Sequence, residues 1–124
     1  MKFKETKSIY QQIADRLCDE ILQGSYHEEE RIPSVREYAA TVEVNANTVV
    51  RSYDQLQGQE IIYNKRGIGY FVAVGAVERI KQLRRTAFLS DELPEFFGSL
   101  TTLDISIEEI EKLYKEWRER EALV

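Results

Sequence analysis

The spacing of apolar residues changes once along this chain, near residue 60, and this change constrains the fold more than any other feature. Before it, apolar residues recur at intervals of three and four, as on one face of a helix. After it, Ile61–Tyr63 and Tyr70–Val72 are rich in the β-branched and aromatic residues that favour strands. The segment between them, Asn64–Gly69, carries two glycines and two adjacent cations and is typical of a turn. The sequence therefore predicts helices followed by a β-hairpin.

Three capping signals divide the helical part into three helices. Ser8–Gln11 and Ser34–Glu37 both have the form of a capping box, in which the first and fourth side chains each bond the other residue's backbone amide. Gly24 is a suitable stop for the first helix, because glycine tolerates the left-handed conformation that ends helices. Asn45 is a favourable N-cap for a third helix that ends at about Gly58.

The third predicted helix has a polar outer face. Val49, Tyr53 and Leu56 fall at helical spacing and form its inward face. The residues that project on the opposite, exposed side are Asn47, Arg51 and Asp54. This side lacks a large apolar residue, so a role in the core does not explain it.

Three helices and a hairpin in this order, with a short turn between the second and third helices, make a winged helix-turn-helix. The third helix of such a module enters the major groove of DNA with its N-terminal residues over the base edges. Asn47 and Thr48 occupy those positions, and Arg51 lies one turn further on. Asparagine can make two hydrogen bonds to adenine, and arginine two to guanine. We therefore expect an α+β, mainly α, fold whose third helix reads bases.

The tip of the predicted hairpin, the wing of this fold, is a second candidate contact. Lys65 and Arg66 would reach phosphates or the minor groove, and Gly67 would let the backbone approach the sugar-phosphate chain closely. Two cations in a turn are, by themselves, more typical of an ordinary polar loop. The wing contact therefore depends on the fold prediction.

We predict a boundary at Gly75 between a DNA-binding domain, residues 1–75, and a helical dimerisation region, residues 76–124. Apolar residues recur at helical spacing from Val77 to Phe88, in a helix expected to end near Ser90–Asp91, and again from Ile107 to Trp117. Residues 93–103 are expected to hold a short helical turn. A region this small buries little apolar surface within one chain. We expect it to pair with a second copy through Ile80, Leu83, Phe88, Ile110, Tyr114 and Trp117.

Five short motifs occur in order between about residues 8 and 74. They are Tyr10-x-Gln12-Ile13, Ile21-x-x-Gly24, Ile32-Pro33-Ser34-Val35-Arg36-Glu37, Val44-Asn45-x-Asn47-Thr48-Val49-x-Arg51-x-Tyr53-x-x-Leu56 and Arg66-Gly67-x-Gly69-x-Phe71-Val72. Together they resemble the GntR family of bacterial transcription regulators. The short remainder resembles the YtrA branch of that family, whose members dimerise through a few C-terminal helices.

The resemblance implies a sequence-specific regulator of transcription that binds a palindromic DNA operator as a homodimer, and we expect it to act as a repressor. Carried over residue by residue, it implies DNA contacts from Arg36, Asn45, Asn47, Thr48, Arg51, Arg66 and Gly67. Asn45 caps a helix in either case, and the two roles can coexist. The sequence also departs from many relatives, with Ala46 and Val50 in place of arginine and with Glu30 and Glu60 in place of glycine.

The formal net charge of −5 leaves a different class of function open. Proteins that bind nucleic acid tend to be basic, so a winged helix that binds RNA or another protein is an alternative. A protein-docking face should expose apolar anchors, whereas Asn47, Thr48 and Arg51 are polar. The acidic residues also cluster at 28–30, 91–95 and 108–121, away from the proposed contacts.

The inventory of reactive residues argues against an enzyme. Cys18 and His27 are the single cysteine and histidine of the chain, so they cannot build a clustered metal site. We expect no catalytic residue, metal or cofactor, and the sequence does not indicate whether a small-molecule effector binds. No apolar run approaches the length of a membrane span, and no secretory signal is evident, so we expect a cytoplasmic protein without membrane contact.

Overall fold

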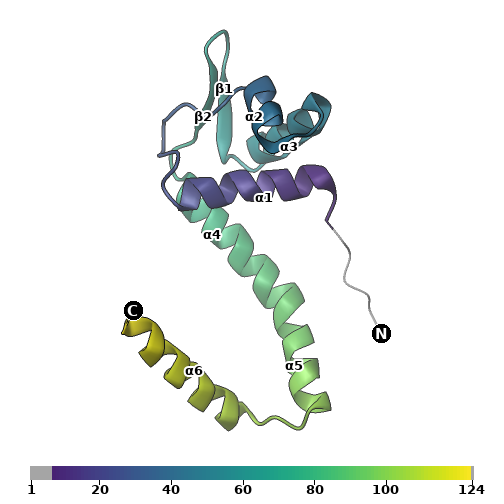
Figure 1. Cartoon of the computed structure of the whole chain (residues 1–124), viewed down its shortest axis with the longest axis vertical. Coiled ribbons are helices and arrows are strands. Elements are labelled where there is room, and N and C mark those ends of the chain that lie inside the picture. Colours follow the sequence, from purple (N-terminus) through teal and green to yellow (C-terminus); the bar gives the residue numbers. More distant parts are fainter. Residues whose placement is uncertain (1–6, 124) are drawn as a thin grey trace. The chain divides into compact units, whose positions relative to one another are not determined.

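The computed structural model describes residues 7–123, which fall into two compact units that divide between Leu83 and Arg84. The first unit holds three helices and a two-stranded hairpin, in the order predicted for a winged helix-turn-helix (Figure 1). The fold prediction is therefore confirmed. Within residues 7–123, no helix is long and apolar enough to cross a membrane.

The three helices of the first unit begin where the capping signals predict. Helix α1 spans Ile9–Leu22, α2 spans Val35–Val42 and α3 spans Ala46–Gly58. Both capping boxes form their reciprocal hydrogen bonds, between Ser8 and Gln11 and between Ser34 and Glu37. Local signals are therefore sufficient to start these helices.

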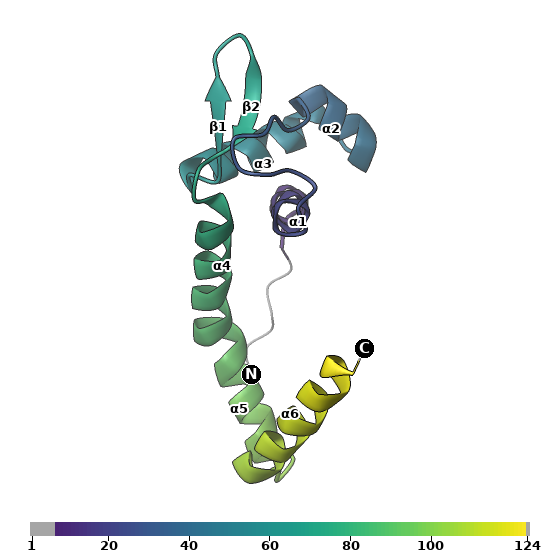
Figure 2. The same ribbon diagram turned by 90° about the vertical axis from the view of Figure 1, so that its left-hand side faces the viewer.

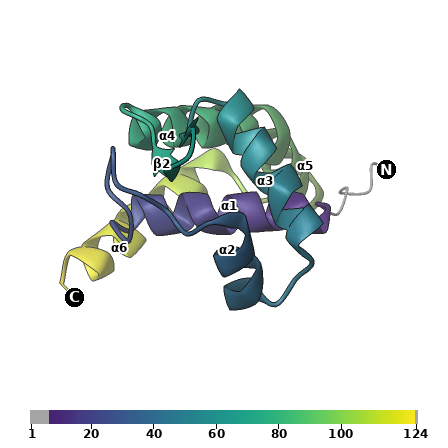
Figure 3. The same ribbon diagram turned by 90° about the horizontal axis from the view of Figure 1, so that it is seen from above.

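A left-handed turn connects α2 to α3. Glu43 ends α2 with a φ of 57°, and the amide of Val44 donates to the carbonyl oxygen of Ala39 at 3.1 Å. The Oδ1 of Asn45 then accepts the Asn47 amide at 2.8 Å, which caps α3 as predicted. The short turn sets α2 at an angle to α3, as Figure 3 shows from above.

The hairpin consists of β1 (Ile62–Lys65) and β2 (Gly69–Val72), which pair antiparallel from Ile62 opposite Val72 to Lys65 opposite Gly69. The strands reach further toward the tip than their apolar residues predict. The amide of Ile68 closes the turn by donating to the carbonyl oxygen of Lys65 at 2.9 Å. Figures 1 and 2 show that the hairpin projects beyond the three helices on the side away from α1.

A short extended segment before α2 pairs with β2, which the sequence analysis did not predict. Arg31 forms an antiparallel bridge with Phe71, and the amide of Ile32 donates to the carbonyl oxygen of Tyr70 at 2.9 Å. Pro33 favours this extended conformation in the residue that precedes it. The pairing ties the base of the hairpin to the start of α2.

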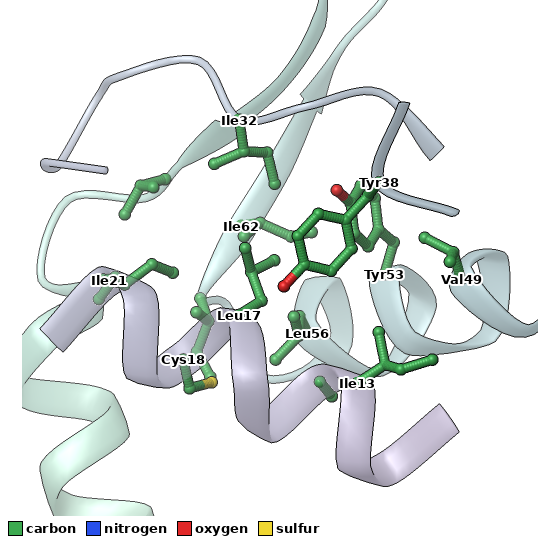
Figure 4. Packing of buried hydrophobic residues seen from close by; sticks show 14 of the residues in the cluster. Ile13, Leu17, Cys18, Ile21, Ile32, Tyr38, Val49, Tyr53, Leu56 and Ile62 are labelled. Carbon is green, nitrogen blue, oxygen red and sulfur yellow. The ribbon is translucent and has the colours of Figure 1, made fainter. Parts of the chain in front are cut away.

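The core of the first unit lies between α1, α3 and the hairpin (Figure 4). Its fully buried side chains include Leu17, Ile32, Tyr38, Val49, Tyr53, Leu56, Ile62 and Val72. The Tyr53 hydroxyl donates to the carbonyl oxygen of Pro33 at 2.7 Å, and the Tyr38 hydroxyl donates to the Glu20 carboxylate. Burial raises the pKa of both tyrosines well above the ordinary value, so both hydroxyls stay neutral donors.

The first turns of α4 (Ala76–Ala87) belong to the same core. Ala76 is fully buried and Ile80 is 1% exposed. The prediction that Ile80 contributes to a surface that pairs with a second copy is therefore wrong, because its own chain covers the side chain. Helical spacing identified the apolar face of α4 but not what covers each part of it.

The second unit contains the π-helical turn η1 (Phe88–Glu92), α5 (Leu93–Thr102) and α6 (Ile107–Ala122). The expected helix end near Ser90 is wrong, because helical structure continues through η1 into α5. Proline lacks an amide proton and sterically crowds the preceding turn. The wider π turn immediately before Pro94 accommodates both effects, and the amide of Leu93 donates to the carbonyl oxygen of Phe88.

Helix α6 begins after Ser106, whose Oγ caps it by accepting the Glu109 amide at 3.1 Å. Leu100 is buried in this unit, whereas many of its large apolar side chains are exposed. The exposed ones include Phe88, Leu89, Phe96, Phe97, Leu103, Ile107, Leu113, Tyr114 and Trp117. An apolar surface this extensive is unusual on an isolated soluble unit.

Candidate nucleic-acid interface

The exposed face of α3 carries the residues that the sequence analysis assigned to base reading. Val49, Ser52, Tyr53 and Leu56 anchor the opposite face in the core, which fixes the rotation of the helix. Asn47 and Arg51 are exposed and lie one turn apart, whereas Thr48 is half-buried beside them. Asn45, exposed at the helix start, already uses its side-chain oxygen in the cap. The predicted group therefore lies together on the N-terminal half of α3.

Arg51 is held by an aromatic ring rather than by a carboxylate. Its guanidinium carbon lies 4.2 Å from the centre of the Tyr10 ring. No described carboxylate lies within ion-pair distance of it. The positive charge of Arg51 is therefore available to a ligand on the exposed face of α3.

Arg36 is exposed in the first turn of α2, next to the Ser34–Glu37 capping box. The backbone amide and the hydroxyl of Ser34 both bond Glu37, and these bonds lower the pKa of its carboxyl. Glu37 thus stays ionised and engaged with the helix start. Among the described residues no ion pair occupies Arg36.

The wing tip carries the remaining predicted contacts. Lys65 Nζ lies 5.0 Å from the centre of the Phe71 ring, and Arg66 is exposed beyond it. Gly67 adopts a left-handed φ of 78°, and a Cβ added there would meet nothing within 4 Å. The backbone at Gly67 is thus open to close approach, as the sequence analysis expected. The tip projects away from the helices (Figure 2), so it forms a patch separate from that on α3.

Two residues near these patches escaped the sequence analysis. Arg31 packs on Gly69, where an added Cβ would lie 2.9 Å from its Nε, and the φ of 141° at this position favours glycine. Tyr10 appeared in the sequence only as part of a motif, and in the structure it is half-buried under Arg51. Tyr10 and Gly69 both belong to the short motifs described above. Neither spacing nor composition could predict that Tyr10 contacts Arg51 and that Gly69 contacts Arg31.

The acidic loop that precedes α2 is engaged within the first unit. Glu28 Oε1 accepts the Gly75 amide at 2.6 Å, and Glu30 Oε2 accepts the His27 amide at 3.2 Å. Arg79 on α4 donates to the carbonyl oxygens of Glu60 and Val74, each at 2.9 Å. These groups stabilise the junction between the hairpin and α4. Residues 7–123 contain no cluster of His, Cys, Asp and Glu that could hold a metal ion.

Comparison with known proteins identifies the family. The model of the bacterial regulatory proteins of the gntR family matches residues 9–72. A crystal structure described as a putative GntR-family transcriptional regulator from Bacteroides thetaiotaomicron has 61% sequence identity and a TM-score of 0.82, and the match covers 92% of this chain and 99% of that one.

Two Bacillus subtilis proteins match over most of their lengths. The uncharacterized HTH-type regulator YhcF is 31% identical over 88% of both chains, and the HTH-type transcriptional repressor YtrA is 26% identical over 91% of this chain and 86% of its own. The DNA-binding domain of AraR, solved in complex with its operator, has 25% identity and a TM-score of 0.53 over 59% of this chain and 88% of that one. This chain belongs to the GntR family of bacterial transcriptional regulators, whose members bind DNA through the domain seen here in residues 9–72.

Proposed function

We propose that this protein represses transcription by binding a palindromic operator as a homodimer. The observation that carries the proposal is the exposed face of α3, where Asn47 and Arg51 lie one turn apart on a helix fixed by its buried side. The Arg51 guanidinium has no carboxylate partner among the described residues. A helix with this face fits the major groove, where asparagine can make two hydrogen bonds to adenine and arginine can make two to guanine. The relative YtrA is named a transcriptional repressor, which supports repression rather than activation.

In the proposed complex each group has a distinct role. Asn47, Thr48 and Arg51 contact bases, and Arg36 and the amide end of α3 at Asn45 contact phosphates beside them. The wing tip contacts the sugar-phosphate chain of the DNA at a second place, through Lys65, Arg66 and the open main chain at Gly67. Residues 1–75 thus form the proposed DNA-binding domain, with the first turns of α4 completing its core.

The negative net charge does not oppose this proposal. Affinity for the phosphate backbone depends on how many cations face it rather than on the total charge. Glu28 and Glu30 bond backbone amides of the acidic loop and its junction, whereas Arg36 and Arg51 have no carboxylate partner among the described residues. We therefore expect a modest affinity for random DNA. We also expect tight binding to the operator to require both of its half-sites.

The second unit supplies the proposed pairing surface. In this unit Phe88, Tyr114 and Trp117 are 49%, 54% and 50% exposed, and Ile110 is half-buried. Leu83, the last residue of the first unit, is 44% exposed and also belongs to the proposed surface. The Tyr114 and Trp117 rings stack with centroids 6.3 Å apart, and each remains about half exposed. A second copy would cover these side chains and bring two winged domains to two half-sites.

Enrichment of a randomised DNA duplex library on the full-length protein tests this function. We expect an inverted repeat to emerge, bound by a protein that sediments as a dimer with and without the duplex. Fluorescence anisotropy with an enriched and a scrambled duplex then gives the specificity ratio. No enriched sequence, or tighter binding to structured RNA than to any duplex, would contradict the proposal. Sedimentation as a monomer at micromolar concentration would contradict its dimeric form.

A further inference from the structure

We propose that Tyr10 is a positioning residue for base recognition, because its ring holds the Arg51 guanidinium in the orientation that the major groove requires. This inference rests on the proposed function and deepens it. Tyr10 is the second residue of α1, far from α3 in sequence. Figure 3 shows α3 crossing α1 near the start of α1. The Arg51 guanidinium lies over the Tyr10 ring.

The geometry of the pair is that of a cation placed over an aromatic face. The Arg51 guanidinium carbon lies 4.2 Å from the Tyr10 ring centre, within the range in which such contacts are attractive. A guanidinium donates its hydrogen bonds in its own plane, so stacking uses the faces of the group and leaves its donors unoccupied. Arg51 can therefore remain on Tyr10 while it makes two hydrogen bonds to a guanine edge.

The backbone beneath Tyr10 is fixed to the same turn of α3. Ser52 Oγ, on a residue that is 0% exposed, donates to the carbonyl oxygen of Tyr10 at 2.7 Å and lies 3.1 Å from that of Thr48. The start of α1 is thus anchored to the residue that follows Arg51. The backbone that carries the Tyr10 ring is therefore held against α3.

The hydroxyl of Tyr10 has no hydrogen-bond partner among the described residues, so the ring itself accounts for the contact. An exposed arginine side chain without such a contact populates many rotamers, and ordering it when DNA binds costs free energy. Tyr10 reduces that cost before DNA arrives. A residue with this role should affect the base pair that Arg51 contacts and leave affinity for random DNA unchanged.

Enrichment from a randomised duplex library, carried out with full-length variants, tests the inference. Arg51→Ala identifies the base pair whose preference depends on Arg51. We expect Tyr10→Leu to lower the preference at that same pair by about three- to tenfold, with the other positions, the affinity for a scrambled duplex and the melting temperature unchanged. Tyr10→Phe, which keeps the ring, should retain the wild-type preference. Tyr10→Gln provides a second ringless variant in case leucine impairs folding.

The outcomes separate this inference from the function on which it rests. A selective wild-type protein whose Tyr10→Leu and Tyr10→Gln variants keep the full preference would overturn the role of Tyr10 alone. A uniform loss over all base pairs, accompanied by a lower melting temperature, would show a purely structural residue and would also overturn it. A wild-type protein that selects no sequence would overturn the proposed function and the inference together.

Discussion

The hydroxyl of Ser52 lies 2.7 Å from the backbone carbonyl oxygen of Tyr10, and this buried hydrogen bond joins the first helix to the third. It is the side-chain bond that holds the start of α1 against the helix proposed to read bases. Because Ser52 is fully buried, its substitution by alanine removes a hydroxyl that has no replacement from solvent and leaves the carbonyl oxygen of Tyr10 without this partner.

Ser52→Ala should therefore lower the free energy of unfolding by about 1–2 kcal/mol. Urea unfolding monitored by circular dichroism measures the change. Ser25→Ala, at an exposed turn of the same unit, is the matched control and should change stability by less than about 0.5 kcal/mol. Equal effects of the two substitutions would show that the buried bond contributes little.

Glu60 offers a gain in stability because it occupies a left-handed conformation, with a φ of 59°. Side chains with a Cβ are disfavoured there, so Glu60→Gly should raise the free energy of unfolding by about 0.5–1 kcal/mol after the entropy of glycine is included. Glu60→Ala is the control. It also removes the exposed carboxylate that lies 4.0 Å from Arg79, but it keeps the Cβ. A gain in both variants would trace the effect to the carboxylate rather than to the backbone.

The features that could be predicted from the sequence are local ones. Capping residues and apolar spacing gave the starts of α1, α2, α3 and α6, and the change of spacing near residue 60 gave the hairpin. The helix end predicted near Ser90–Asp91 was wrong, because the π turn that leads into Pro94 leaves no simple sequence signal.

Contacts between distant segments could not be predicted in the same way. The bridge from Arg31 to Phe71, the burial of Ile80 and the stacking of Arg51 on Tyr10 each join elements that are far apart in the chain. Periodicity tells which face of a helix is apolar, but the partner of that face depends on the assembled fold. The exposed positions of Asn47 and Arg51 were predictable because they follow from the inward face of α3.

Removal of the wing charges should reduce DNA affinity without changing specificity. Lys65→Ala combined with Arg66→Ala eliminates two proposed phosphate contacts, so binding to enriched and scrambled duplexes should weaken about equally. The slope of log affinity against log salt concentration should fall by about one for each lost contact. Lys112→Ala with Lys115→Ala, two exposed cations of α6, matches the change in net charge and should leave the slope unaltered. An unchanged slope in the wing variant would show that the hairpin tip does not reach DNA.

Two truncations should separate the winged domain from its pairing surface. A chain that ends at Leu83 keeps Ala76 and Ile80 and should fold as a monomer, whereas a chain that ends at Gly75 should lose about 2–4 kcal/mol of stability with those buried side chains. Sedimentation and urea unfolding measure the two properties. The affinity of the longer truncation for an inverted repeat should collapse, because the second half-site no longer gains from high effective concentration. A dimer that persists after truncation at Leu83 would rule out pairing through the second unit.

Substitutions on α6 provide the matching test in the full-length chain. Tyr114→Ala with Trp117→Ala should shift the sedimenting species toward monomer, because both exposed rings belong to the proposed pairing surface. Glu119→Ala, on the opposite side of α6, should leave the dimer intact. Equal sedimentation of both variants would place the pairing surface elsewhere.

The specificity ratio of Arg51→Ala tests the central claim most directly, since that claim is that the exposed face of α3 reads bases. The ratio is the affinity for an enriched duplex divided by the affinity for a scrambled one, measured by fluorescence anisotropy at fixed salt. We predict that Arg51→Ala loses about 1–3 kcal/mol on the enriched duplex, with little loss on the scrambled one, and that discrimination relaxes at one base pair in each half-site. Equal losses on the two duplexes would show that Arg51 contacts only phosphate and would contradict base reading by this residue.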